Sequence, residues 1–148
     1  MTIFQCRDSL EGILCGVYDA WTSRLGHENA ALELENTGNL KMFAQYRNVE
    51  ESQEKADKVI AAILRKAGRQ VYEMVFRAAL SREEEKADRI YRFLINALNC
   101  GSKVADMLQI PAVYEIFRMD RNVGNEAHLL IEFARFSETK GKVLVCMV

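Results

Sequence analysis

The end of the chain places the strongest constraint on its fold, because it contains an apolar segment that cannot lie exposed. Residues 141–148 are predicted to form a strand, and every residue from Val143 to Val148 is apolar. An amphipathic helix is predicted directly before it, from Arg121 to Glu138. Because an unpaired apolar strand exposes both its side chains and its backbone hydrogen-bonding groups, this strand must pair with earlier strands or with a continuation beyond residue 148.

The predicted helix 121–138 carries polar residues on one face, at steps of four and three that place them on successive turns. These residues, here called the Arg121–Arg135 face, are Arg121, Asn125, His128, Glu132 and Arg135. Apolar residues of the same period follow the opposite side. We therefore expect the Arg121–Arg135 face to point outward. Its residues suit docking of a protein or internal salt links, such as Glu132 with Arg135, better than direct contact with nucleic acid. Acidic neighbours such as Glu126 leave the face too weakly basic to hold a polyanion by charge alone.

The rest of the chain predicts an α+β fold, in which one mostly helical domain of residues 1–148 includes a small antiparallel sheet. A short first strand is expected at residues 2–6, and alternating polar and apolar residues predict further short strands at 31–35 and 42–46. Apolar stripes at helical spacing predict a helix over residues 9–25 and further helices from Ser52 onward. Two capping boxes, Asp8 with Glu11 and Ser81 with Glu84, are predicted to begin helices. Gly101 is predicted to end the second of these, and Pro111 to begin a separate segment that ends near Met119.

Composition excludes several classes of protein. The chain is 49% hydrophobic and 28% charged with a net charge of −1, which is typical of a folded globular protein rather than a disordered one. No apolar stretch approaches the roughly 20 residues that cross a bilayer, so no membrane partner is expected. The N-terminus lacks the basic and apolar regions of a signal peptide, and the reducing cytoplasm is the expected location. Residues 55–92 carry 10 basic and 6 acidic groups, and this locally basic stretch favours phosphate contacts or a solvated helix face.

The sequence contains no complete catalytic or metal-binding pattern. His128 and Glu132 lie four residues apart on one predicted face, but two ligands are too few for tetrahedral zinc. Glycine-rich phosphate-binding patterns are absent, so no cofactor is expected. The four cysteines lie in apolar segments without C-x-x-C spacing, which favours buried thiols; they are Cys6, Cys15, Cys100 and Cys146. Whether the chain is an enzyme stays open at this level.

Several strings of residues resemble one bacterial family of DNA-metabolism or DNA-repair proteins. They are residues 4–14, 17–21, 54–60, 79–81 and 86–91 and, most specifically, the run Val123-Gly-Asn-Glu-Ala-His-Leu-Leu-Ile-Glu-Phe-Ala-Arg-Phe-Ser-Glu138. The similar proteins are encoded beside a radical-SAM protein, and some are fused to a domain like uracil-DNA glycosylase. They are also longer, continuing after a strand like residues 141–148, so the chain resembles their N-terminal portion.

The resemblance implies an accessory module of DNA repair or DNA metabolism that acts with a radical-SAM partner. The Arg121–Arg135 face, chosen from the residue pattern, is the surface that we expect to contact DNA or that partner. Two alternatives stay open. The chain can be part of a DNA-acting enzyme, glycosylase-like or nuclease-like, that needs a missing C-terminal portion. It can also be a helical protein–protein scaffold without a nucleic-acid role.

Overall fold

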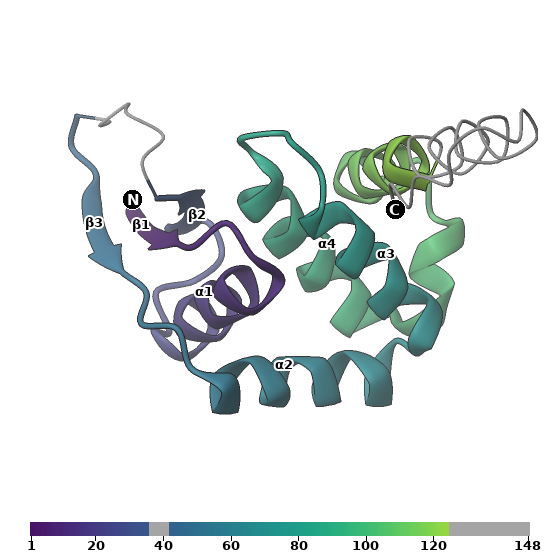
Figure 1. Cartoon of the computed structure of the whole chain (residues 1–148), viewed down its shortest axis with the longest axis horizontal. Coiled ribbons are helices and arrows are strands. Elements are labelled where there is room, and N and C mark those ends of the chain that lie inside the picture. The colour runs from purple at the N-terminus through teal and green to yellow at the C-terminus, as the bar shows by residue number, and fades with distance from the viewer. Residues whose placement is uncertain (36–41, 125–148) are drawn as a thin grey trace, which may run out of the picture.

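The computed structural model describes residues 1–35 and 42–124, which form a small sheet and a larger set of helices (Figure 1). The strands are β1 (Thr2–Cys6), β2 (Ala30–Leu34) and β3 (Gln45–Asn48). The helices are α1 (Leu10–Thr22), α2 (Gln53–Lys66), α3 (Arg69–Ala79), α4 (Lys86–Cys100) and the 3-10 helix η1 (Gly101–Asp106). Residues 111–124 are also helical. Within these ranges every helix is too short or too polar to span a bilayer.

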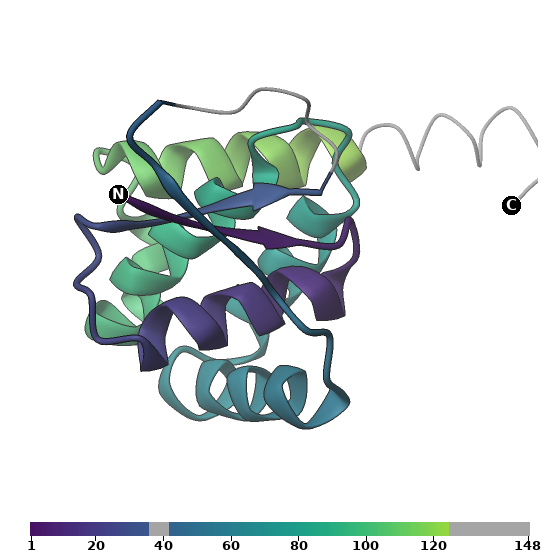
Figure 2. The same ribbon diagram turned by 90° about the vertical axis from the view of Figure 1, so that its left-hand side faces the viewer.

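The sheet has the order β2-β1-β3, and both of its pairings are parallel. The prediction of a mostly helical structure with a small sheet is confirmed, but the prediction that the sheet is antiparallel is wrong. The reason is the connection between β1 and β2: α1 returns the chain to the starting edge, so β2 runs in the same direction as β1 and makes a mostly helical α/β structure. β3 then pairs with the other side of β1 and runs obliquely across it (Figure 2).

Two local predictions also need correction. The third strand begins at Gln45 rather than Met42, and Met42 and Phe43 lie in an exposed turn, 83% and 95% accessible. Helical residues run without a break from 111 to 124, so the boundary predicted near Arg121 is wrong. The predicted strand 141–148 lies outside the described residues.

The caps of α1 and α4 also differ from the predicted capping boxes. Ser9, not Asp8, caps α1, because its Oγ accepts the Gly12 N–H at 3.0 Å. Asp8 instead forms an ion pair with Lys86. Ser81 Oγ accepts the Glu83 N–H at 3.2 Å within a turn, and α4 begins only at Lys86. The predicted end of α4 at Gly101 is confirmed, with φ of +72°.

Helix α1 packs closely on the sheet because a glycine faces it. A Cβ atom added at Gly16 would lie 3.0 Å from Leu32 Cδ2 and 3.4 Å from Cys6 Cβ, so the close approach depends on the missing side chain. The core continues from this contact into the helices and includes Ile13, Leu14, Ile63, Phe93 and Leu94, all fully buried. Figure 1 shows α1 and α2 beneath the sheet, with α3 and α4 to one side and α4 nearer to β2.

Helix α4 lies along the free edge of β2 and satisfies its backbone. Asp88 Oδ1 accepts the Leu32 N–H at 3.2 Å, and Arg92 Nη2 donates to the Ala30 carbonyl at 2.6 Å. Because an open strand edge invites pairing with other chains, these contacts protect β2 as well as fix α4. At the opposite edge, β3 presents the exposed side chains of Gln45, Arg47 and Asn48.

The predicted burial of the cysteines is confirmed for Cys6 and Cys15 and wrong for Cys100. Cys15 lies where α1 meets the start of α2: its Sγ donates to the Ser52 carbonyl at 3.1 Å and accepts the Ser52 N–H at 3.3 Å. Cys100 is exposed because it ends α4, beyond the stripe that faces the core. Cys146 lies outside the described residues.

Candidate functional site

The structure places one residue of the predicted Arg121–Arg135 face. Arg121 is exposed on the helical segment 111–124, and its guanidinium carbon lies 5.8 Å from the centroid of the Phe117 ring. At that separation the ring attracts the cation and orients the side chain across the helix surface. Asn125, His128, Glu132 and Arg135 lie outside the described residues, so the alignment of the whole face stays a prediction.

The inner side of the same helix is fixed to the start of α4 by a network of ion pairs. Arg118 Nη2 donates to Glu83 Oε1 at 2.7 Å and to Glu115 Oε2 at 2.8 Å. Arg89 reaches the same two carboxylates, at 2.9 Å and 3.3 Å, and also Glu85 at 2.9 Å. A single exposed ion pair contributes about 0–1 kcal/mol, but a shared network of planar guanidinium groups holds a defined geometry.

These contacts also change the acidity of the groups that make them. Burial alone would raise the pKa of the Glu83 carboxyl, but the hydrogen bond and charge of Arg118, with the charge of Arg89, outweigh burial and lower that pKa below its usual value. The hydrogen bonds to Glu83 and Glu115 raise the pKa of the Arg118 guanidinium. Both groups are therefore fully charged at neutral pH, and Arg118 is committed to its carboxylates.

Beside this network lies a cleft of about 350 Å³, here called the Arg118 cleft. Its lining residues come from the turn before α4 and from the helical segment 111–124: Ser81, Arg82, Glu83, Arg118, Asn122 and Val123. Arg82 and Asn122 are exposed, and within residues 1–35 and 42–124 neither has an ionic or hydrogen-bonded side-chain partner. The Arg118 cleft thus offers a guanidinium and an amide that are available to a carboxylate, a phosphate or a base edge.

The sequence indicated Arg82 only through its position in the basic stretch 55–92, and it did not single out Asn122. Arg121 adjoins Asn122 along the helix, so the edge of the predicted face meets the Arg118 cleft. The two lining segments are about 40 residues apart in the chain, and their meeting depends on how helix 111–124 packs against α3 and α4.

The titratable groups elsewhere in the described structure are arranged for packing. His27 Nδ1 lies 2.7 Å from the Tyr91 hydroxyl, and its ring packs against Trp21. Among residues 1–35 and 42–124 there is no group of three or more His, Cys, Asp or Glu side chains that can hold a metal ion. The guanidinium and amide groups that line the Arg118 cleft can recognise an anionic or polar group.

Comparison with known proteins found a family model that matches the C-terminal part of the chain, which includes one side of the Arg118 cleft. Residues 84–148 match the model of DUF4130, a domain of unknown function. Searches of curated proteins and of solved structures found no match. The matched region includes α4 and the helical segment 111–124, with Arg118, Arg121 and Asn122, and begins directly after Glu83. One side of the cleft, with Arg118, Asn122 and Val123, thus lies within the region similar to DUF4130, and the other side lies just before it.

Proposed function

We propose that this chain is an accessory module in DNA repair or DNA metabolism that acts with a radical-SAM protein, and that the Arg118 cleft and the adjoining Arg121–Arg135 face form its binding surface. The observation that carries the proposal is the availability of Arg82 and Arg121. Both are exposed, and neither has an acidic partner among the residues that the structure describes. Arg82 lines the cleft together with Asn122, and Arg121 precedes Asn122 on the helix. The sequence resemblance supplies the DNA-repair context and the radical-SAM partner.

The charges around the cleft favour docking of a protein over holding DNA by charge alone. Glu83, Glu84, Glu85 and Glu115 lie in the same region as the arginines, so no uniformly basic surface is formed. Non-specific DNA binding needs several phosphate contacts without nearby carboxylates. A partner with complementary charge can instead use two or three guanidinium contacts at the rim of a mainly packed interface.

The test is a pair of titrations of the full chain, one with a purified radical-SAM protein of the kind encoded beside the similar proteins and one with a labelled DNA duplex. We expect the double variant Arg82→Ala with Arg121→Ala, and likewise Arg121→Ala with Arg135→Ala, to weaken partner binding by about tenfold or more. Arg65→Ala is the matched control, because Arg65 is exposed on α2 and has no partner within the described part of the chain.

Circular dichroism and thermal unfolding would establish that each variant keeps the fold. Unchanged affinity for both the radical-SAM protein and DNA in the two double variants would overturn the proposal for this surface. If only DNA binding is weakened, with a strong dependence on salt, the surface contacts phosphates and the docking role is wrong.

A further inference from the structure

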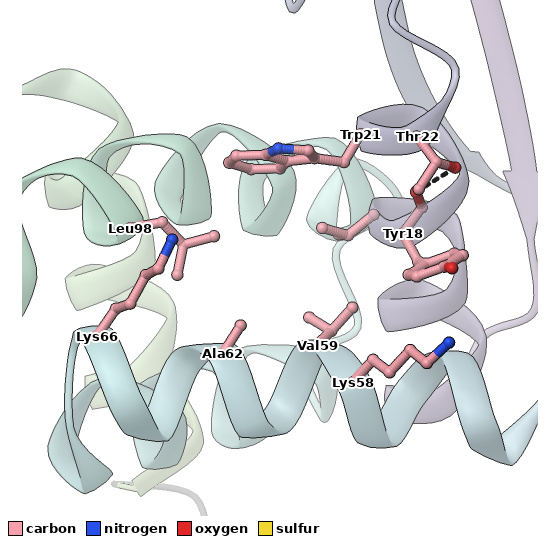
Figure 3. Close-up of a pocket in the computed structure, with 9 residues that line it drawn as sticks. Tyr18, Trp21, Thr22, Lys58, Val59, Ala62, Lys66 and Leu98 are labelled. Carbon is pink, nitrogen blue, oxygen red and sulfur yellow. Dashed lines mark hydrogen bonds between the residues drawn. The ribbon is translucent and has the colours of Figure 1, made fainter.

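A second hollow lies on a different part of the molecule, where α1, α2 and α4 meet. It has a volume of about 230 Å³ and is lined mainly by apolar side chains. Figure 3 shows the Trp21 ring across its top, Val59 and Ala62 rising from α2 beneath it, and Leu98 of α4 at one end. We call this hollow the Trp21 groove. An indole face opposite small aliphatic groups makes a slot that suits a flat apolar ring.

Contacts with His27, outside the groove, fix the orientation of the Trp21 ring. Trp21 is 39% exposed, and its ring meets that of His27 edge to face, with centroids 4.9 Å apart. His27 is in turn bound to the hydroxyl of Tyr91, a fully buried residue of α4. Because the indole has neighbours that fix its orientation in the free protein, a ligand entering the groove does not have to order it first.

The charges at the groove all have one sign. Its lining includes two charged side chains, those of Lys58 and Lys66, and no carboxylate. The Lys58 ammonium lies 5.7 Å from the centroid of the Tyr18 ring and 3.3 Å from a carboxylate oxygen of Glu54. Lys66 extends along the other end toward Leu98 (Figure 3) and has no acidic partner in the described structure. One end of an apolar slot therefore carries an unneutralised positive charge.

We propose that the Trp21 groove binds a small planar aromatic carboxylate, with its ring between Trp21 and Ala62 and its acid group at the Lys66 ammonium. The volume is below the roughly 300–1,000 Å³ of pockets for drug-sized ligands, so it suits one ring or two fused rings. A neutral aromatic ligand gains only the apolar contacts with the groove, and a cationic ligand is repelled by the Lys66 ammonium. An anionic ligand gains the apolar contacts and also a charge-assisted hydrogen bond from that ammonium. This inference is independent of the function proposed for the Arg118 cleft.

Trp21 itself provides the measurement, because it is the only tryptophan in the chain. The probe is 4-iodobenzoate, whose iodine quenches indole emission when the ring lies against it, and 4-iodobenzamide is the neutral match of the same shape. We expect saturable quenching by the benzoate, with an affinity about tenfold or more above that of the benzamide. Linear, non-saturating quenching by both compounds, as in random collision, would overturn the proposal.

Two variants with matched controls locate the binding. Lys66→Gln should weaken the benzoate about tenfold and leave the benzamide unchanged, whereas Lys103→Gln, at an exposed lysine of η1, should change neither. Ala62→Leu should abolish saturation by filling the slot, whereas Ala61→Leu, at an exposed neighbour outside the groove, should leave it intact. Full benzoate affinity in Lys66→Gln would overturn the assigned charge contact, and full affinity in a folded Ala62→Leu would overturn the site.

Discussion

His27 Nδ1 lies 2.7 Å from the hydroxyl oxygen of Tyr91, which joins the loop before β2 to the buried side of α4. Nearby, Arg92 donates to the His27 carbonyl, so the loop is attached to α4 through both its backbone and its side chain. Since the described sheet packs on α4 mainly through β2, this attachment determines how sheet and helices meet.

Replacing Tyr91 with phenylalanine removes the hydroxyl and keeps the ring. We expect Tyr91→Phe to lower the free energy of unfolding by about 1 kcal/mol, because the His27 nitrogen, which is only half-buried, regains water when its partner is lost. Urea unfolding followed by circular dichroism measures the change. Tyr114→Phe is the control, since Tyr114 is 50% exposed and should show no effect. Equal stability of both variants and the parent would show that the contact does not stabilise the fold.

Lys86 is a buried cation that closes the end of α3. Its side chain is almost completely buried, and its Nζ donates to the carbonyl oxygens of Ala79 at 2.7 Å and Ser81 at 2.8 Å and forms an ion pair with Asp8. Lys86→Met keeps the aliphatic length but leaves those carbonyls and the carboxylate without their donor. We expect a loss of about 1–3 kcal/mol, measured as a fall in the urea midpoint, because two carbonyl groups lose their donor.

Two comparisons test the cause of that loss. Asp8→Asn should cost much less, because the Asp8 side chain is 65% exposed and its carboxylate is hydrated in any case. Lys103→Met changes an exposed lysine and should be nearly neutral. A cost for Asp8→Asn equal to that for Lys86→Met would mean that the ion pair, rather than the helix-end carbonyls, accounts for the effect.

The cysteines should react in an order set by burial. Burial raises the pKa of the Cys6 thiol to about 12, with a further contribution from the charge of Glu35, so almost none of it is thiolate at pH 8. Among the three cysteines that the structure describes, we expect iodoacetamide at pH 8 to label Cys100 first in the native protein and to spare Cys6 and Cys15 until urea unfolds the chain. Peptide mapping by mass spectrometry scores each site separately. Labelling of Cys6 at the rate of Cys100 would contradict its burial in the sheet.

The helices were predictable because each buries an apolar stripe that recurs at helical spacing. The stripes of Ala56, Val59 and Ile63 and of Val71, Met74 and Val75 lie buried in α2 and α3, as their spacing indicates. Alternation within a five-residue strand shows which residues share a face, but it does not show whether the neighbouring strand runs parallel. The helix predicted at residues 9–25, between the strands at 2–6 and 31–35, was the signal for a parallel pair, and the antiparallel prediction did not use it.

The candidate site was predictable only in part, for a related reason. The exposure of Arg121 follows from its place opposite the apolar stripe of its helix, and the structure confirms it. Arg82 lies in a turn before α4 and Asn122 on the helix that packs against that turn. Their meeting depends on the ion pairs of Arg118 with Glu83 and of Glu115 with Arg89, and no spacing rule within one element encodes such a contact between elements.

The ion-pair network beside the Arg118 cleft should make stability depend on pH. Because the folded pKa of Glu83 lies below its usual value, its stabilising contribution is fully present above the ordinary glutamate pKa of about 4.3 and is lost as the pH falls through the lower, folded pKa. We expect Glu83→Gln to be less stable than the parent at pH 7, by no more than about 1 kcal/mol, since the side chain is one-third exposed and the pairs are screened.

The difference between Glu83→Gln and the parent should narrow steadily as the pH is lowered from 5 toward 2, because the parent carboxyl then becomes neutral like the amide. Urea titrations of both proteins at each pH measure this difference in the free energy of unfolding. Glu54→Gln is the control, since the Glu54 side chain is 79% exposed and its pair with Lys58 should contribute almost nothing at any pH. If Glu83→Gln differs from the parent by the same amount at every pH, the charge of Glu83 is not what fixes helix 111–124 against α4, and shape alone would have to do so.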